Sequence, residues 1–362
     1  MLEMRIGLVI YGSLDTVSGG YLYDRHVVDA LRAAGDQVDI ISLPARAYAL
    51  SLADNGSAEW QRRMNCSYDV LLQDELNHPS LAWANGRLGT KRPPIVAIVH
   101  HLRSSEARPA WQNKFYRRVE SRYLNSVDAF IYNSYTTRRT VERELAGVRP
   151  HVVAYPGKDR LARFGMVGNR PPRAHDEPLR LLFVGNLIPR KGLHVLLEAL
   201  TQVSGHWQLR IVGSSTVDPA YAQRLHEVAL RRQLSERVTW CGVLDDQALA
   251  AEMAVADVLA MPSEYEGFGI VYVEGMGFGL PALATTAGGA RDIISDGVNG
   301  FLVPAGDVAA LAGRIEALAA ERGLLTRLSE AALARYAALP TWAATMKTIR
   351  EFLLSIAHRE RT

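Results

Sequence analysis

Two adjacent cations stand in this sequence where an apolar run gives way to a helical pattern. The run ends at Val184, and Arg190 and Lys191 follow it after a short turn. The start of a helix favours anions, because its first N–H groups are unpaired and its dipole is positive there. Arg190 adds a planar fork of donors and Lys191 a compact charge, which together suit a diphosphate. The alternative is a helix start whose cations only face solvent.

A second group of polar residues follows the apolar run Asp257–Met261. Glu266 and Glu274 are eight residues apart, about two helical turns, which predicts that they lie near one face of a helix. Gly267 and Gly269 allow the backbone to come close to a ligand. Buried carboxylates need hydrogen-bond donors, and sugar or ribose hydroxyls would supply them. The alternative for either carboxylate is a structural ion pair.

Three familiar motifs are absent from the sequence. Gly-x-Gly-x-x-Gly does not follow the first apolar run, because the pair Gly19-Gly20 comes too late. The segment Gly185–Gly192 lacks the Gly-Lys-Ser/Thr ending of a P-loop. No Asp-x-Asp triplet is present to carry a divalent cation on a diphosphate. We therefore expect neither an NAD enzyme nor a P-loop ATPase, and we expect no cofactor and no metal.

Nearly all-apolar runs alternate with helical patterns along the whole chain, which predicts parallel sheets buried on both faces. The 362 residues exceed what one core usually serves. The alternation is interrupted at residues 164–178, where glycines and prolines without an apolar period predict a linker. We predict an α/β protein with two doubly wound, Rossmann-like domains, residues 1–168 and 178–342, facing across a cleft at the carboxyl ends of their strands.

The composition is that of a globular chain, with 48% hydrophobic and 22% charged residues, and excludes a collagen, a coiled coil and a long disordered protein. Cys66 and Cys241 cannot form a disulfide framework or a zinc site by themselves. No run approaches the roughly 18 apolar residues of a membrane span. We expect a cytoplasmic protein.

Positive charge gathers in residues 100–143, which hold nine Lys or Arg and four Asp or Glu. Trp111 and Phe115 stand among these cations, so residues 103–143 could contact an anionic membrane from its inner face or a phosphorylated acceptor. A helix whose charges only face water is the alternative. The modules of nucleic-acid-binding proteins are absent, and we expect no nucleic-acid partner.

The pattern around the two glutamates resembles the family 4 retaining glycosyltransferases, which have the GT-B fold. The resemblance is strong over residues 180–303 and thinner before them. It is carried by Glu-x7-Glu within Glu-Gly-Phe-Gly, Arg190-Lys191-Gly192, Gly279-Leu280-Pro281, Gly288-Gly289 and the segment 296–303. In the first half it rests on Ser18-Gly19-Gly20 and the strand-terminal His100.

By this resemblance Arg190 and Lys191 hold the donor's diphosphate, Glu274 binds the ribose hydroxyls and Glu266 contacts the donor sugar. The remaining residues of the implied donor site are Gly19, Gly20, Val243, Gly267, Phe268, Gly269, Ile270 and Val271. The implied catalytic residues are His100, Glu266, Arg190 and Lys191. Because His101 follows His100 directly, the sequence leaves open which ring faces the site.

The resemblance implies the transfer of a hexosyl group from a UDP- or GDP-sugar to an acceptor hydroxyl, with retention at the anomeric carbon. Such a reaction serves glycan, glycolipid or glycoconjugate synthesis, including that of the cell envelope. The first domain would bind the acceptor, and a final helix at about 343–362 would pack back on it. Two alternatives are a nonhydrolysing UDP-sugar epimerase of similar architecture and a noncatalytic sugar-nucleotide binding protein.

Overall fold

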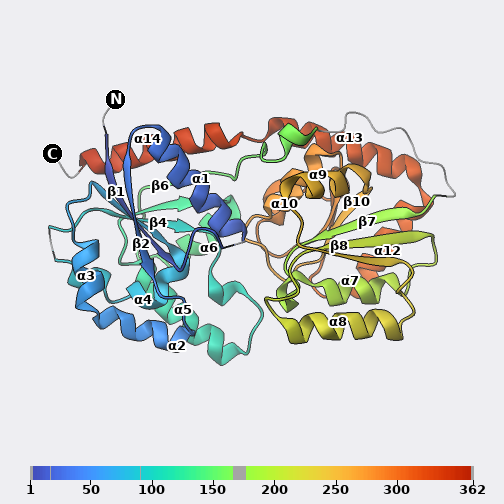
Figure 1. The fold of residues 1–362 in the computed structure, drawn as a ribbon, viewed down its shortest axis with the longest axis horizontal. Helices are drawn as coiled ribbons and strands as arrows, with labels where there is room; N and C mark the ends of the chain where they lie inside the picture. The colour runs from blue at the N-terminus through green and yellow to red at the C-terminus, as the bar shows by residue number, and fades with distance from the viewer. Residues whose placement is uncertain (1–2, 17, 90, 166–176, 360–362) are drawn as a thin grey trace. The chain divides into compact units, whose positions relative to one another are not determined.

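The computed structural model describes residues 3–16, 18–89, 91–165 and 177–359. The chain divides into two compact units. Unit 1 comprises Met1–Gly157 and Pro340–Thr362, and unit 2 comprises Lys158–Leu339 (Figure 1). Each unit is built around one six-stranded sheet, so the prediction of two doubly wound α/β domains is confirmed.

Unit 1 has a parallel sheet with the strand order β2-β1-β3-β4-β5-β6. Every residue of β3 and β4 is buried, as a sheet covered by helices on both faces requires. The strands are β1 (Arg5–Tyr11), β2 (Gln37–Leu43), β3 (Val70–Asp74), β4 (Ile95–Val99), β5 (Ala129–Tyr132) and β6 (His151–Val153). The helices are α1 (Gly19–Ala33), α2 (Tyr48–Ser51), α3 (Ala58–Met64), α4 (His78–Leu81), α5 (Ala110–Leu124), α6 (Tyr135–Glu142) and α14 (Trp342–Arg359).

The last helix, α14, belongs to unit 1 although unit 2 separates it from the rest in sequence. It packs beside α1, and the red and blue helices lie next to each other in Figure 1. The Trp342 ring stacks on His26 with 3.8 Å between ring centroids. Farther along, Arg350 Nε donates to Asp36 Oδ2 at 2.7 Å. A stacked ring pair and a buried ion pair therefore fix both halves of α14 on the first part of the chain.

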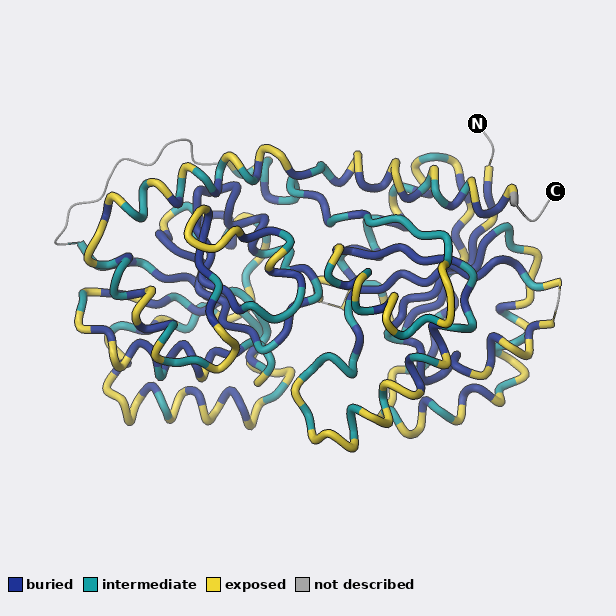
Figure 2. The backbone as a smooth tube through the Cα atoms, turned by 180° about the vertical axis from the view of Figure 1, so that it is seen from behind, coloured by how far each residue is buried: buried dark blue, intermediate teal, exposed yellow. Residues whose placement is uncertain are grey.

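Unit 2 has a second parallel sheet, with the order β12-β11-β10-β7-β8-β9. Its strands lie inside the unit, whereas the outer faces of its helices are exposed (Figure 2). The strands are β7 (Leu179–Val184), β8 (Trp207–Val212), β9 (Val238–Gly242), β10 (Val258–Met261), β11 (Ala282–Thr285) and β12 (Gly300–Val303). The helices are α7 (Leu193–Leu200), α8 (Pro219–Arg231), α9 (Asp246–Val255), α10 (Ile270–Gly277), α11 (Ala290–Ile293), α12 (Val308–Ala320) and α13 (Arg322–Ala338).

The chain passes between the units at Gly157/Lys158, earlier than the linker predicted at 164–178. The physical reason lies in the contacts of Lys158, whose Nζ donates to the carbonyl oxygen of Ala337 at 2.7 Å, and of the residues that follow it. These residues pack with unit 2 although the sequence assigned them to a first domain ending at 168. Most of the predicted linker, residues 166–176, lies outside the described residues.

Candidate functional site

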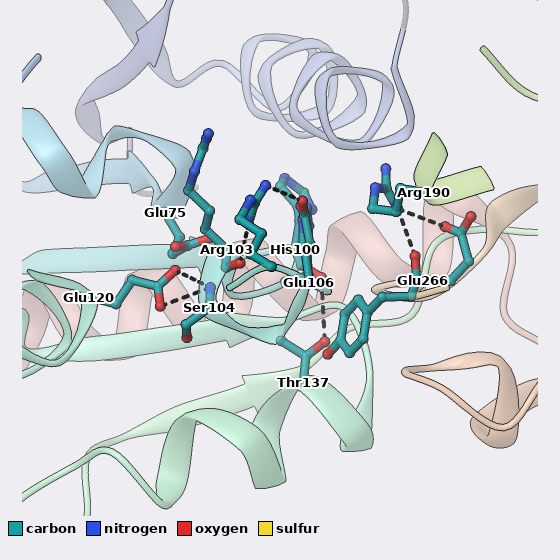
Figure 3. Close-up of polar contacts among 12 residues, drawn as sticks. Glu75, His100, Arg103, Ser104, Glu106, Glu120, Thr137, Arg190 and Glu266 are labelled. Atoms are coloured by element: carbon teal, nitrogen blue, oxygen red, sulfur yellow. Dashed lines mark hydrogen bonds and ion pairs between the residues drawn. The ribbon is translucent and has the colours of Figure 1, made fainter. Parts of the chain in front are cut away.

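The two adjacent cations lie in a single 3-10 turn, Pro189–Lys191, directly before α7. The backbone of this turn is tied to the segment after β10, because Glu264 N–H donates to the carbonyl oxygen of Arg190 at 2.8 Å. Arg190 Nη1 donates to the carbonyl oxygen of Tyr265 at 2.7 Å (Figure 3). Both side chains thus turn from the end of β7 toward the end of β10.

Glu266 meets both cations. Lys191 Nζ donates to Glu266 Oε1. Arg190 Nη1 lies 3.9 Å from Glu266 Oε2, and Figure 3 shows these two side chains facing each other. Ser263 Oγ donates to the same Oε1 at 2.9 Å. Burial alone raises the pKa of the Glu266 carboxyl, but Lys191 and Arg190 outweigh it and hold this pKa at about 2. The side chain is therefore a carboxylate at every ordinary pH, and its charge is shared between two cations.

The placement of Glu266 and Glu274 on one helical face was wrong. The helix α10 begins only at Ile270, and Glu266 lies before it in an extended segment that bridges to Gly288. The reason is Gly269, which stands at the start of α10 with a φ of 91°, in the left-handed region that favours glycine. The chain therefore turns between the two glutamates instead of continuing as a helix.

Glu274 lies in the middle of α10 and is 4% exposed. Its Oε1 accepts a hydrogen bond from Arg160 Nε at 2.5 Å, and Arg160 Nη1 also donates to Asp246 Oδ1. Burial lowers the pKa of the Arg160 guanidinium, but Glu274 and then Asp246 outweigh it, so the pKa is raised. Arg160 was not predicted from the sequence, because among the 41 Lys and Arg residues of the chain nothing in its local sequence distinguishes it.

Four further residues predicted for the donor site belong to unit 2. Phe268 is buried, and Ile270 and Val271 are half-buried in the first turn of α10. Val243 is exposed, in the turn between β9 and α9. Apolar side chains that remain accessible at a helix start and after a strand can line a ligand, but their roles stay predictions.

His100 follows β4 in unit 1 and is buried against α1. Its Nε2 lies 3.2 Å from Asp24 Oδ1. A Cβ atom on Gly20 would stand 3.1 Å from His100 Cδ2, so a larger residue at this position would crowd the His100 ring. Burial lowers the pKa of His100, but Asp24 outweighs it and the pKa rises to about 9. His100 is therefore a cation at neutral pH.

The neighbouring His101 has a different environment. Its Nε2 pairs with Glu106 Oε1 at 2.9 Å, whereas the His100 ring lies beside Gly20 in the first turn of α1. In unit 1 the structure thus brings together His100 and Gly20 among the predicted residues. In unit 2 it brings together Arg190, Lys191 and Glu266.

Known proteins resemble both units. The family model for glycosyl transferases group 1 matches residues 169–335. A phosphatidyl-myo-inositol mannosyltransferase from Mycobacterium leprae is 32% identical over 359 residues, covering 87% of each chain. The chain belongs to the group 1 glycosyl transferases. The resemblance to family 4 is thereby confirmed. The lipopolysaccharide core biosynthesis glycosyltransferase LpsE from Rhizobium meliloti is 26% identical, covering 84% of this chain and 86% of LpsE.

Solved structures agree on the architecture of this glycosyl transferase. Sucrose-phosphate synthase from Thermosynechococcus elongatus superposes with a TM-score of 0.81 at 23% identity, covering 98% of this chain and 99% of that chain. Anabaena HepE in complex with UDP-glucose superposes with a TM-score of 0.76 at 21% identity, covering 98% and 100%. At such identities the likeness shows the fold alone, and it is the GT-B fold.

Two groups of side chains in this glycosyl transferase could hold a metal ion, among the residues that the structure describes. They are Asp24, Asp74 and His100, and Glu75, His78 and Glu120. Some of these side chains already have hydrogen-bond partners. The His78 ring bonds the Tyr48 hydroxyl, and both Glu120 carboxylate oxygens accept from Ser104 N–H (Figure 3). The members of each group come from separate elements, so no sequence motif predicts either group. Metal independence of the transferase stays a prediction.

No helix within the described ranges of this glycosyl transferase is both long enough and apolar enough to cross a membrane.

The turn that carries the two cations depends on Gly192. Its φ is 70°, and a Cβ atom would stand 2.0 Å from the carbonyl oxygen of Pro262. We expect Gly192→Ala to lower the free energy of unfolding by about 3 kcal/mol, since left-handed strain adds to a clash with rigid backbone. Urea denaturation measures the loss. Gly313→Ala is the control, because nothing lies within 4 Å of that Cβ position in α12, and a loss as large there would contradict the explanation.

Proposed function

We propose that this glycosyl transferase moves a hexosyl group from a UDP- or GDP-sugar to an acceptor hydroxyl, with retention at the anomeric carbon. That the chain is a glycosyltransferase is established by its family; the donor and the stereochemistry belong to the proposal. The observation that carries it is the buried Glu266 carboxylate beside Arg190 and Lys191. A bound diphosphate would replace Glu266 as the partner of these cations, and the carboxylate would then accept hydrogen bonds from sugar hydroxyls.

In the proposed reaction the bond from the anomeric carbon to the β-phosphate oxygen breaks, and the acceptor oxygen bonds to that carbon on the same face. The proton of the acceptor hydroxyl passes to the departing phosphate oxygen, so no protein base is required. Arg190 and Lys191 stabilise the negative charge that develops on the diphosphate. Because these fixed cations supply the positive charge, the proposal includes no metal and no cofactor.

We assign His100 the role of a hydrogen-bond donor. A cation would repel the positive charge that develops on the sugar ring, so His100 is not suited to stabilise that centre by its charge. A protonated imidazole is instead a strong hydrogen-bond donor. We propose that it orients a hydroxyl of the donor sugar, with Asp24 keeping it protonated.

The relatives support a role in envelope or lipid glycosylation, as their names specify a phosphatidyl-myo-inositol mannosyltransferase and a lipopolysaccharide core glycosyltransferase. HepE was solved with UDP-glucose, which supports a nucleotide sugar as donor. No observation favours the epimerase or a noncatalytic binding protein. We propose that the enzyme acts in the cytoplasm, with unit 1 binding the acceptor and unit 2 the donor.

A panel of UDP- and GDP-sugars tests this function through thermal stabilisation and slow donor hydrolysis with EDTA present. One donor should raise the melting temperature and be hydrolysed, and NMR of the transfer product should show the donor's anomeric configuration. No response to any nucleotide sugar would overturn the donor class, and an inverted product would overturn retention. Loss of activity in EDTA, restored by a divalent cation, would overturn metal independence.

We also propose that α5 docks on an anionic membrane surface. Trp111 and Phe115 are 70% and 45% exposed. Exposed cations share their face of the helix at helical spacing, and they are Lys114, Arg118 and Arg122. Aromatic rings beside basic side chains are typical of helices that lie in a lipid interface.

Replacement of these three cations by glutamine is expected to weaken binding to phosphatidylglycerol vesicles about a hundredfold, at about 1 kcal/mol per basic residue. Cosedimentation with vesicles measures it, with phosphatidylcholine vesicles as the neutral reference. Leu230→Ala on α8 is the control, because Leu230 is an apolar residue that is 70% exposed, as Trp111 is on α5. Wild-type protein that ignores phosphatidylglycerol vesicles would contradict the membrane proposal.

A further inference from the structure

Arg160 bridges two acidic residues of unit 2 that come from different helices. Its Nε donates to Glu274 Oε1 of α10, and its Nη1 donates to Asp246 Oδ1 of α9. The guanidinium is mostly buried between them. Arg160 itself lies in the short segment that follows the change of unit after Gly157, so neither helix contributes it.

Arg160 is the counter-ion of the buried Glu274 carboxylate. A carboxylate that is 4% exposed has lost most of its hydration, which is costly unless a cation or hydrogen-bond donors replace the water. Arg160 is the cation that forms an ion pair with Glu274 within the described part of the chain. Without it, Glu274 would be a buried charge lacking its counter-ion, and its side chain would no longer be held in one orientation.

The second contact joins Arg160 to α9. Asp246 is the first residue of α9 and follows the turn 241–244, which contains Val243; by the family resemblance this turn holds the base of the donor through backbone groups. Glu274 is the residue expected to bind the ribose hydroxyls. A planar guanidinium can bond both carboxylates at once through its separate N–H groups, whereas a lysine has a single charged head.

We propose that Arg160 is a positioning residue for the nucleoside half of the donor site, which holds Glu274 toward the ribose hydroxyls and ties it to the base-binding turn. The inference rests on the proposed function, in which Glu274 binds ribose. Arg160 and a ribose can share the carboxylate, because its two oxygens offer about four acceptor positions and Nε uses one of them.

The test compares the dissociation constants of UDP and 2′-deoxy-UDP, measured by calorimetry on the full chain, or of the guanine pair if the wild type prefers GDP. The wild type should prefer the ribose form about tenfold, as expected for a hydroxyl bonded to a charged acceptor. Glu274→Gln and Arg160→Ala should each reduce that preference to near one, and the double variant should reduce it no further. Arg160→Lys should recover part of it.

Two controls separate positioning from general damage. Arg163→Ala removes a neighbouring arginine that is 72% exposed and 3.7 Å from Asp246, and it should keep the ribose preference. Pyrophosphate should bind Arg160→Ala as tightly as the wild type, because Lys191 and Arg190 are untouched. If Arg160→Ala does not fold, Arg160→Gln and Arg160→Lys are measured in its place.

The outcomes are distinguishable. Loss of ribose preference in both the Arg160 and the Glu274 variants supports the inference. If Glu274→Gln loses the preference while the Arg160 variants keep it, the ribose assignment stands and the positioning role is overturned. If Glu274→Gln keeps the preference, the ribose assignment itself fails, and the inference fails with it.

Discussion

Replacement of Lys191 by alanine is expected to lower kcat for glycosyl transfer about a hundredfold to a thousandfold, the usual cost of removing a group that stabilises transition-state charge. In the structure Lys191 Nζ bonds Glu266, and in the proposed reaction it would face the diphosphate. Without it, negative charge would develop on the leaving group with one fixed cation, Arg190, in place of two. Initial rates at saturating donor measure the loss.

Lys347→Ala is the matched control for this change. Lys347 is 77% exposed on α14 and forms a long ion pair with Glu351, at 3.9 Å, so its removal should leave kcat unchanged. Thermal unfolding of both variants shows whether the Lys191 variant has lost its fold, since Glu266 becomes a buried carboxylate with a weaker partner. A folded Lys191→Ala variant with wild-type turnover would refute the diphosphate assignment.

The second large effect concerns pH and the pair His100–Asp24. The pKa of His100 rises from 6.5 to about 9. A raised pKa means that folding is favoured by the protonated form, so this stabilisation is complete below pH 6.5 and is lost as the pH rises through 9. Its size is about 3 kcal/mol. We expect kcat and the free energy of unfolding to fall together above pH 9.

In the Asp24→Asn variant kcat should begin to fall at a lower pH than in the wild type. Asp24 is the group that raises the pKa of His100 most, and the variant loses its charge while burial still lowers that pKa. At pH 8.5 we expect kcat at least tenfold below the wild type, with a smaller deficit at pH 6. His206→Gln, an exposed histidine before β8, should leave the profile unchanged. If Asp24→Asn and the wild type had the same pH profile, Asp24 would not control the protonation of His100.

Much of the fold could be predicted from local pattern. Continuous apolar runs are a property of neighbouring residues, and the run Ile95–Val99 forms a fully buried strand. The family motif around Glu266 could also be recognised, because its residues are close together in the sequence. Its conformation could not be predicted, since Gly269 interrupts the helix that the eight-residue spacing of Glu266 and Glu274 suggested.

The partners of the charged residues could not be predicted in the same way. Asp24 and His100 are 76 residues apart, and Arg160 and Glu274 are 114 apart. Such pairs are determined by how separate helices, strands and loops pack in three dimensions, and a single sequence has no periodicity that records this packing. Arg160 therefore emerges only from three-dimensional proximity.

The two parts of unit 1 are synthesised at different times, one before unit 2 and one after it. Its sheet is synthesised first, but Trp342 and Arg350, which hold α14 against α1 and Asp36, follow only after the whole of unit 2. Domains generally fold in the order in which they are made. Here unit 1 begins first, but α14 covers its apolar surface only after unit 2 has been synthesised. A nascent chain that stops short of residue 342 carries a finished unit 2 and an open, aggregation-prone unit 1.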